Sequence, residues 1–406
     1  MEQHRTVTAT GGLCAKCGAC TAACPVFQVT GREYHGGRGK LHLLARLDPH
    51  TASATYAEIL SRCLLCGACE AVCPRGLKIT DEIARARAQL SRRAGEHNFL
   101  RFLTRQALAH PGLAKGLGTL LRLAEKLPAE SGLRLRLNLP AADAVTAKAP
   151  PPPGPVDPAT PLLYFAGCFA THLQPEIALA TASLCRKTGQ PRPVVARGQG
   201  CCGLAAYAAG DLDTAKKLAR RNLEAFAGSE APILVSCASC LSHLTSYPAL
   251  LADEPEWRDQ AIAFVARLRE FSTLLLAGLA DQTTDRAPQP PASRQRVLYH
   301  DPCHLRFRLK ITEAPRTLLG RFPQLQLVEL PHGPQCCGHG GLFHLAHPTL
   351  SAEIRDRLLA DFAATGAETV TTTCTGCLLQ WQQGLAMTEH PSRVMHLALL
   401  LDTLLP

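Results

Sequence analysis

Residues 14–25 read CAKCGACTAACP, and residues 63–74 read CLLCGACEAVCP. Both stretches have the spacing C-x2-C-x2-C-x3-C-P, so each places four thiols and a proline within a short run. This spacing is a ligand pattern of [4Fe–4S] clusters, because it bends the backbone around one cluster and brings three thiolates to three irons. Two such runs in one chain predict two cubane clusters near the N-terminus.

Disulfides and zinc are the alternative uses of so many cysteines. A disulfide framework is typical of small secreted chains, whereas this chain has 406 residues and no signal-peptide-like apolar core in residues 1–12. A zinc site does not explain why the same run, ending in proline, occurs twice. Iron–sulfur clusters are therefore the favoured interpretation.

The two runs resemble those of bacterial two-cluster ferredoxins, in which the fourth cysteine of each run ligates the other cluster. The resemblance implies that one cubane binds Cys14, Cys17, Cys20 and Cys73, and that the other binds Cys63, Cys66, Cys69 and Cys24. We expect this ferredoxin-like domain to cover residues 1–95. It is predicted to be α-helical, because the stretches 40–60 and 79–89 have helical rather than strand-like patterns.

The composition indicates a folded protein of two or three domains. Hydrophobic residues make up 46% of the chain, and no stretch offers the ~18 uninterrupted apolar residues of a membrane span. An aromatic content of 5%, without a nucleic-acid-binding motif, argues against nucleic acid as a partner. We expect a cytoplasmic protein with reduced thiols, either free or peripheral on the inner face of the membrane.

Positive charge is concentrated after the ferredoxin-like domain. The net charge is +10, and residues 81–140 hold 11 Lys and Arg against 5 Asp and Glu, a difference of +6. We expect a basic helical extension over 96–140. One possibility is that it binds anionic lipid or an acidic partner subunit. The other is that its helices pack on their own domain and expose their arginines to solvent. The Ala- and Pro-rich segment 141–161 is expected to be a semi-rigid linker.

The sequence repeats itself after this linker. Each copy carries a single cysteine, a Cys-Cys-Gly triplet and a C-x2-C pair, and in both copies the triplet begins 33 positions after the single cysteine. The first copy holds Cys168, Cys201, Cys202, Cys237 and Cys240, and the second holds Cys303, Cys336, Cys337, Cys374 and Cys377. This self-similarity indicates a duplicated domain over 162–285 and 294–406.

Short apolar runs precede the cysteines in both copies. They cover residues 162–166, 193–196, 233–235, 297–299, 325–330 and 369–373. Helical patterns such as 176–188 and 213–227 separate them, which predicts βα units with a largely parallel sheet. The cysteines then follow the carboxyl ends of strands, where open α/β sheets bind their ligands.

Five cysteines per copy exceed what one cubane or one tetrahedral metal ion requires. Either one thiol is spare, or the cluster is not a cubane. Neighbouring cysteines such as Cys201 and Cys202 can both reach one cluster only at a tight turn, for which the following Gly203 and Gly338 are suited.

The spacing C-x32-C-C-G-x33-C-x2-C, with Cys303 set in the string His300-Asp301-Pro302-Cys303-His304, resembles the duplicated CCG domain found in heterodisulfide reductases. The whole chain, with two ferredoxin runs before two CCG domains and the string Val394-Met395-His396-Leu397 near its end, resembles the iron–sulfur subunit of glycolate oxidase and D-lactate dehydrogenase complexes. One of the subunits of anaerobic glycerol-3-phosphate dehydrogenase has a similar architecture. The resemblance implies one further iron–sulfur cluster in each CCG domain, either a cubane or a non-cubane [4Fe–4S] cluster.

The resemblance also implies a partner. In that family a separate FAD subunit oxidises a 2-hydroxy acid, and the iron–sulfur subunit carries electrons towards a quinone or another carrier. The alternative is a catalytic thiol–disulfide or quinone reductase acting at a CCG cluster. Clusters that serve stability alone are less favoured, because a chain this long has sufficient cores. The sequence shows no flavin-binding or nicotinamide-binding motif, and no catalytic residue is assigned.

Several other residues attract attention. Cys185 stands outside the four patterns, on the predicted helix 176–188, and is expected to be a small buried hydrophobe. His300, His304 and His339 adjoin ligand cysteines and could ligate, relay protons or tune a cluster; a local structural or supporting role is favoured. The glycine-rich residues 36–40 lack the spacing of a phosphate-binding loop and are interpreted as a turn before a helix.

Overall fold

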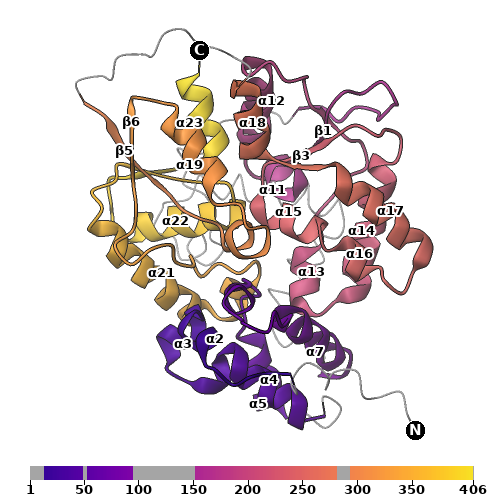
Figure 1. Ribbon diagram of the computed structural model, residues 1–406, viewed down its shortest axis with the longest axis vertical. Coiled ribbons are helices and arrows are strands. Elements are labelled where there is room, and N and C mark those ends of the chain that lie inside the picture. Colours follow the sequence, from indigo (N-terminus) through magenta and orange to yellow (C-terminus); the bar gives the residue numbers. More distant parts are fainter. Residues whose placement is uncertain (1–12, 49–52, 95–150, 281–292, 406) are drawn as a thin grey trace.

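The computed structural model describes residues 13–48, 53–94, 151–280 and 293–405. A group of short helices forms one end of the molecule, and two α/β units lie side by side at the other end (Figure 1). The predicted basic extension 96–140 and the first part of the predicted linker lie outside the described residues. Among the helices of the described ranges, none is long and apolar enough to cross a membrane.

The described residues of the ferredoxin-like domain form helices and connecting loops without a strand, as predicted. Glycines with positive φ start two of its short helices, since Gly18 (φ 84°) and Gly67 (φ 83°) are the N-caps of the helices that carry Cys20 and Cys69. Its elements are α2 (Ala19–Ala22), α3 (Pro25–Thr30), η1 (Glu33–His35), α4 (Gly37–Arg46), α5 (Ala54–Ser61), α6 (Ala68–Ala71) and α7 (Ile79–Ala94). The helix α4 begins at Gly37, so most of residues 36–40 are helical, and the preceding turn is η1. The interpretation of this whole segment as a turn is thus wrong.

Each of the following two units contains a four-stranded parallel sheet. The first is built from β1 (Leu163–Phe165), β2 (Val194–Val195), β3 (Ile233–Val235) and β4 (Leu268–Glu270), in the order β2-β1-β3-β4. The second is built from β5 (Gln295–Tyr299), β6 (Leu325–Val328), β7 (Thr369–Thr372) and β8 (Arg393–His396), in the order β6-β5-β7-β8. The strand order is the same in both sheets and all pairs are parallel, as expected for a duplicated domain.

The helices follow the strands as βα units. Those of the first unit are α11 (Gly167–His172), α12 (Glu176–Lys187), α13 (Leu204–Ala209), α14 (Leu212–Phe226), α15 (Ala238–Leu244), α16 (Tyr247–Leu250), α17 (Pro255–Arg267) and α18 (Phe271–Ala280). Those of the second are the π-helical turn η4 (His304–Arg308), α19 (Glu313–Gly320), α20 (Phe343–Ala346), α21 (Pro348–Ala363), α22 (Thr375–Met387) and α23 (Leu397–Leu404). The predicted helices 176–188 and 213–227 are confirmed as α12 and α14.

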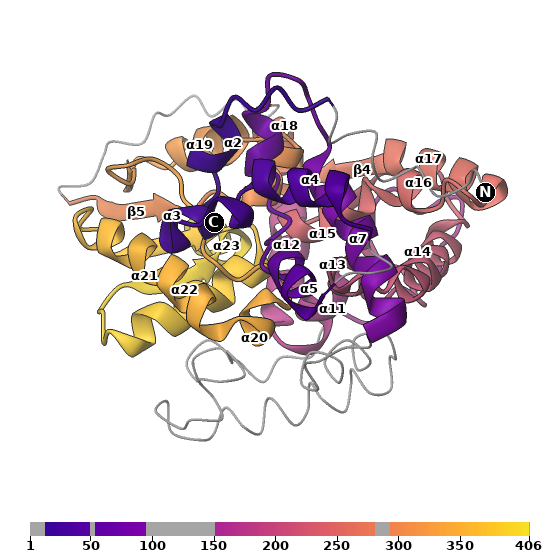
Figure 2. The ribbon, with the colours of Figure 1, turned by 90° about the horizontal axis from the view of Figure 1, so that it is seen from below.

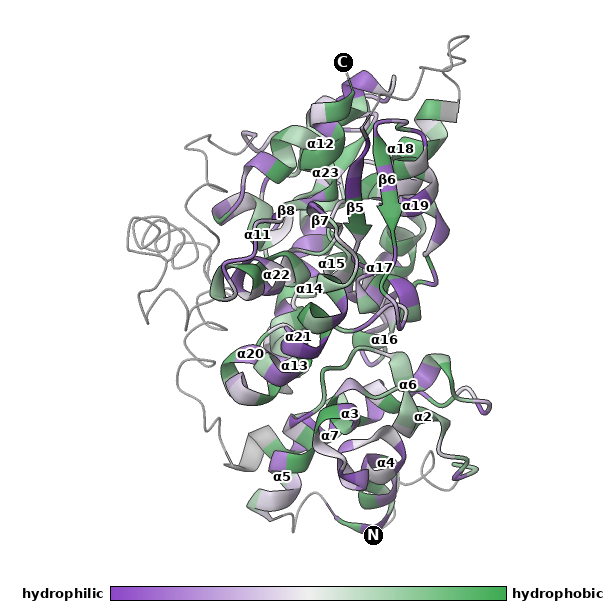
Figure 3. Cartoon of the chain, turned by 90° about the vertical axis from the view of Figure 1, so that its left-hand side faces the viewer, coloured by the Kyte–Doolittle hydropathy of each residue, from purple (hydrophilic) through white to green (hydrophobic). Residues whose placement is uncertain are grey.

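The six predicted strands are confirmed, whereas β4 and β8 were not predicted. The strand β4 has only three residues, of which Arg269 is exposed, so its sequence lacks a buried apolar run. Strand β5 begins with the polar residues Gln295 and Arg296 and becomes hydrophobic towards its end (Figure 3), and its last three residues are buried. Central parallel strands are buried on both faces and usually carry continuous apolar runs, as β1 and β3 do, whereas β7 is equally buried but has the sequence Thr-Val-Thr-Thr.

The two α/β units share one hydrophobic core. Helices α12 and α18 of the first unit pack against α23 and α19 of the second (Figure 1). Buried residues from both units meet there, including Leu184 and Phe271 from the first and Leu318 and Leu401 from the second. Cys185 lies in this core with no exposed surface, as expected for a buried hydrophobe.

The ferredoxin-like domain lies across the ends of both units (Figure 2). Helix α3 packs on α21, α6 packs on η4, and α7 packs on α13. Arg87 of α7 connects the parts directly, because its guanidinium donates to the carbonyls of Cys63 and Ala208. The domain therefore contacts both α/β units in the regions that follow their strands.

Candidate metal centres

Two cavities lie within the ferredoxin-like domain. We call the first the inner cavity; its wall includes Cys24, Cys63, Cys66 and Cys69. We call the second the outer cavity; its wall includes Cys14, Cys17, Cys20 and Cys73. Each cavity thus combines three cysteines of one run with the fourth cysteine of the other. This is the grouping that crosswise ligation requires, although ligation itself stays a prediction.

The two cavities adjoin at the start of helix α4. A β-carbon placed on Gly37 would come within 3.1 Å of Cβ of Cys69 and 3.5 Å of Cβ of Cys20. A residue with a side chain would therefore crowd these two cysteines. The outer cavity is near the surface, where Cys17 is exposed, whereas Cys66 and Cys69 of the inner cavity are buried. The inner site is thus the more shielded of the two.

Five of the six cysteines of the first α/β unit, all except Cys185, converge on one place, and we call them group 1. They lie beyond the ends of β1, β2 and β3: Cys168 in α11, Cys201 and Cys202 before α13, Cys237 as the N-cap of α15, and Cys240 within α15. Gly203, with φ 94°, provides the tight turn after the adjacent pair. The sequence prediction that these cysteines follow strand ends is confirmed.

The thiols of group 1 form a continuous hydrogen-bonded chain. The Cys201 sulfur accepts from Cys168 and Cys202, which holds the pKa of Cys201 well below its usual value. The same hydrogen bond raises the pKa of Cys168, because Cys168 is the donor and would lose the bond together with its proton. Burial adds to this effect. Buried thiolates this close together repel one another, and bound metal cations relieve such repulsion. The donor set therefore fits an iron–sulfur cluster.

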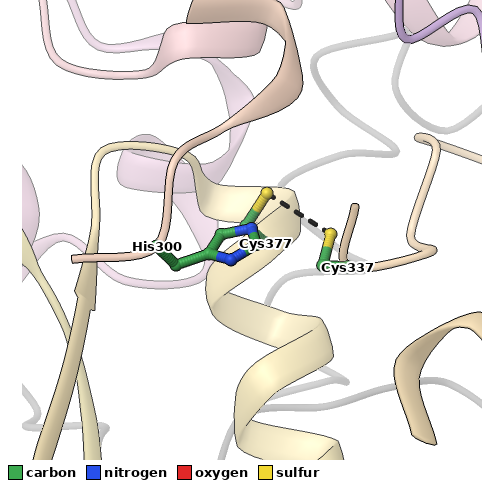
Figure 4. Close-up of side chains that lie close together, drawn as sticks. All are labelled: His300, Cys337 and Cys377. Atoms are coloured by element: carbon green, nitrogen blue, oxygen red, sulfur yellow. Dashed lines mark hydrogen bonds between the residues drawn. The ribbon is translucent and has the colours of Figure 1, made fainter. Parts of the chain in front are cut away.

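The second α/β unit repeats this arrangement with Cys303, Cys336, Cys337, Cys374 and Cys377, which we call group 2. Cys336 accepts from Cys303 and Cys337, so its pKa is lowered well below the usual value, as for Cys201. The sulfurs of Cys337 and Cys377 are 3.4 Å apart (Figure 4). None of the 19 cysteines, all of which lie in the described ranges, forms a disulfide.

His300 projects from the end of β5 towards group 2 (Figure 4). One ring nitrogen of His300 and the sulfurs of Cys337 and Cys377 all lie within 4.8 Å of one another. The ring is buried, and its Nε2 has no hydrogen-bond partner among the described residues. Burial lowers the pKa of His300 to about 4, so the imidazole is neutral, which is the form that ligates metals. The sequence favours a local structural or supporting role for His300, whereas its position in the fold makes it a candidate ligand.

The other histidines near the cysteines differ in how well their nitrogens are paired. His396 is fully bonded, because it accepts from the Ala398 amide at 3.1 Å and its Nε2 lies 3.1 Å from the Ser236 carbonyl, which indicates a structural role. His339 is buried beside group 2, stacks on His344, and has neither ring nitrogen paired in the described part of the chain. His304 bonds to the backbone of Leu65 in the ferredoxin-like domain, which gives it a local structural role.

The inner cavity adjoins group 2. Cys66, Cys303 and Cys336 belong to one apolar cluster together with Leu64 and Phe343, which spans the boundary between the ferredoxin-like domain and the second unit. Burial is the main reason that the pKa of Cys66 is raised, and the negative charge of Cys336 adds to it. The two cysteine sets are therefore neighbours, although they come from different domains.

Group 2 in turn adjoins group 1. The thiols of Cys237 and Cys374 are hydrogen-bonded to each other across the boundary between the units. Cys237 Sγ also lies 3.3 Å from the hydroxyl of Thr375, and Cys374 Sγ lies 3.5 Å from that of Ser239. The order outer cavity, inner cavity, group 2, group 1 is called the cysteine row below.

Comparisons with known proteins agree with this architecture. The family described as 4Fe-4S dicluster domain matches residues 12–77, and the family described as cysteine-rich domain matches residues 162–245 and 297–382. The chain is 29% identical to the probable glycolate oxidase iron-sulfur subunit of Bacillus subtilis, over 96% of this chain and 92% of the relative. It is 28% identical to the glycolate oxidase iron-sulfur subunit of Escherichia coli, over 90% and 88%. It is 32% identical to lactate utilization protein A of an Exiguobacterium species, over 59% of this chain and 95% of the relative.

Proposed function

We propose that this chain, which belongs to the family of glycolate oxidase iron-sulfur subunits and lactate utilization proteins A, is the electron-transfer subunit of a flavin-dependent 2-hydroxyacid dehydrogenase. Glycolate and lactate, which appear in the names of its relatives, are both 2-hydroxy acids. Oxidation of a 2-hydroxy acid to a 2-oxo acid releases two electrons and two protons. A separate FAD subunit would take these up, and this chain would pass the electrons singly towards a quinone or another carrier.

The cysteine row is the observation that carries this proposal. Four thiol sets follow one another without a gap: the cavities meet at Gly37, Cys66 meets Cys336, and Cys374 meets Cys237. Electron transfer slows steeply with distance, so a protein that only needed clusters for stability would have no reason to place all four in contact. Iron–sulfur clusters supply reversible one-electron transfer when bound.

We assign ligands to each site on the same basis. The outer cavity would hold one cubane by Cys14, Cys17, Cys20 and Cys73, and the inner cavity the other by Cys24, Cys63, Cys66 and Cys69. Groups 1 and 2 would each hold one further cluster with five thiolates, for which a non-cubane form is favoured because five sulfurs converge. Six of these ten cysteines are buried and the other four are half-buried, so groups 1 and 2 are largely shielded from water.

The acceptor is a quinone or another carrier. A quinone acceptor would bring the chain to a membrane surface, and the basic segment 96–140, which lies outside the described residues, is the candidate lipid contact. The segment could instead contact an acidic partner subunit. Vesicle sedimentation of the full chain with anionic and with neutral lipid would separate these possibilities.

The experiment that tests the function uses the reconstituted full chain under anaerobic conditions. Alone, it should not reduce a dye with glycolate or lactate, since the oxidising flavin belongs to the partner. With the flavin dehydrogenase of the same organism present, either hydroxy acid should reduce its clusters, and a soluble quinone should reoxidise them. Turnover of a disulfide by the isolated chain, lost when Cys201 or Cys337 is replaced, would contradict this proposal and support a catalytic reductase.

A further inference from the structure

Lys40 is a buried cation with an unusual environment. It lies on α4 in the wall of the inner cavity, and only 1% of its surface is exposed. Its Nζ donates to the His35 carbonyl, and no carboxylate pairs with it among the residues that the structure describes. An ammonium group removed from water is strongly destabilising unless an anion compensates it.

The groups around Lys40 show which anion could do so. Arg87 is another cation of this region and donates to the Cys63 carbonyl, and His35, whose pKa burial lowers to about 4, brings no charge. Lys40 shares the wall of the inner cavity with Cys24, Cys63, Cys66 and Cys69, whereas Arg62, the other cation of that wall, is paired with Glu58 at 2.9 Å. The compensating charge in this part of the molecule thus comes from the cysteines of the inner cavity.

We propose that the Lys40 ammonium is the counter-charge of the cluster bound in the inner cavity and makes that cluster easier to reduce. This inference rests on the proposed cluster ligation, and it deepens the proposed function. A [4Fe–4S] cluster with four thiolates is an anion that gains a further negative charge on reduction. A fixed buried cation beside it stabilises the reduced form more than the oxidised form.

The outer cavity provides the contrast. Its nearest cation along the same helix is Arg38, whose side chain is about one-third exposed (34%) and is paired with Glu33 at 2.7 Å. Solvent and the carboxylate both weaken the effect of this charge on the outer site. Arg38 is therefore a matched control, since it lies two residues from Lys40 and lines the other cavity.

The test is a redox titration of the reconstituted full chain, followed by electron paramagnetic resonance, in the variants Lys40→Met, Lys40→Arg and Arg38→Met. In Lys40→Met we expect the reduction equilibrium of one cubane to fall at least tenfold, a negative shift of about 59 mV for one electron. Lys40→Arg should retain most of the original potential. Arg38→Met should shift the other cubane, and by less.

Every outcome bears on the proposal. An unchanged potential in Lys40→Met, with full iron content, would overturn it. Loss of one cubane in Lys40→Met that Lys40→Arg restores would support it, because charge rather than shape is then required. Loss of that cubane in both variants would overturn it, because Lys40 then serves packing. The titration needs no flavin subunit, so it is independent of the proposed function. Missing cubane signals in the unmodified chain would contradict the proposed cluster ligation. Missing electron transfer from the flavin subunit to the clusters would contradict the proposed function.

Discussion

The thiol of Cys237 and the thiol of Cys374 are hydrogen-bonded across the boundary between the two α/β units. Each residue is the N-cap of the helix that follows the third strand of its unit, β3 in the first and β7 in the second. The duplicated domains are therefore joined at equivalent points of their cysteine groups. This contact connects the last two sites of the cysteine row, so the order in which electrons reach the sites can be tested.

The first prediction concerns this order. Because group 2 lies between the inner cavity and group 1, Cys336→Ser should prevent reduction of the group 1 site by the flavin partner, while the cubanes are still reduced. The matched variant Cys201→Ser, at the equivalent position of group 1, should leave reduction of the group 2 site intact. Rapid freeze-quench electron paramagnetic resonance measures both. Normal reduction of the group 1 site in Cys336→Ser would show that a second route exists.

The second prediction concerns crosswise ligation. The full chain should bind about eight irons in its two cubanes and further iron in groups 1 and 2. Cys24→Ser should damage the cluster of the inner cavity, whose other ligands are Cys63, Cys66 and Cys69, and Cys73→Ser should damage that of the outer cavity. Iron and sulfide analysis with spectroscopy of the two variants checks this. If Cys24→Ser removed the signal assigned to Cys14, Cys17 and Cys20, the pairing would be reversed.

The third prediction concerns His300. The first unit has Phe165 at the equivalent position, three residues before its single cysteine, so His300→Phe gives group 2 the surroundings of group 1. If the imidazole binds iron, pulsed electron paramagnetic resonance should detect nitrogen coupling that this variant loses. The reduction potential should also fall, because imidazole ligands raise cluster potentials relative to thiolates.

The matched control for His300 is His304→Phe, since Phe169 occupies the equivalent position in the first unit. This change should preserve the nitrogen coupling, because His304 bonds to the Leu65 backbone. Coupling that survives in His300→Phe would exclude His300 as the source.

The fourth prediction concerns the contact between α7 and α13. Gly210 has φ 85°, and a β-carbon there would lie 2.6 Å from the carbonyl carbon of Arg87. Gly210→Ala should therefore lower the free energy of unfolding by about 2–4 kcal/mol, combining the left-handed backbone cost with a clash. Gly333→Ala separates the two effects, because Gly333 has φ 75° but a β-carbon there would meet no atom within 4 Å.

Denaturant unfolding of the reconstituted chain measures both glycine variants. We expect Gly333→Ala to show only the backbone cost of about 1–2 kcal/mol. Equal losses of unfolding free energy in the two variants would mean that Gly210 is not in close contact with the ferredoxin-like domain.

Much of the architecture was predictable because the relevant signals are local. The cysteine runs, the helices after them and the buried central strands depend on residues that are close in the chain. The strand β1 is recognisable from three consecutive buried apolar residues, and α12 from its helical periodicity. By contrast, β4 and β8 are edge strands whose residues are partly exposed, and only pairing with β3 and β7 identifies them.

The site was only partly predictable for the same reason. Spacing identified all 18 candidate ligand cysteines, but it did not reveal that His300 lies beside Cys337 and Cys377, which are 37 and 77 residues further along the chain. Lys40 is another example. In the sequence it ends a glycine-rich segment and resembles any solvated lysine, whereas in the fold it is buried against the inner cavity.

Ligand spacing, tight glycine turns and the duplication are properties of short segments, so the order of amino acids was enough to group the cysteines into sets. It could not say which sets are neighbours, because that depends on the packing of distant segments. The contact of Cys66 with Cys303 and Cys336 requires α3 and α6 to pack against α21 and η4, and the contact of Cys237 with Cys374 requires the shared core between the units. Burial of apolar surface between domains, rather than any local pattern, brings these residues together.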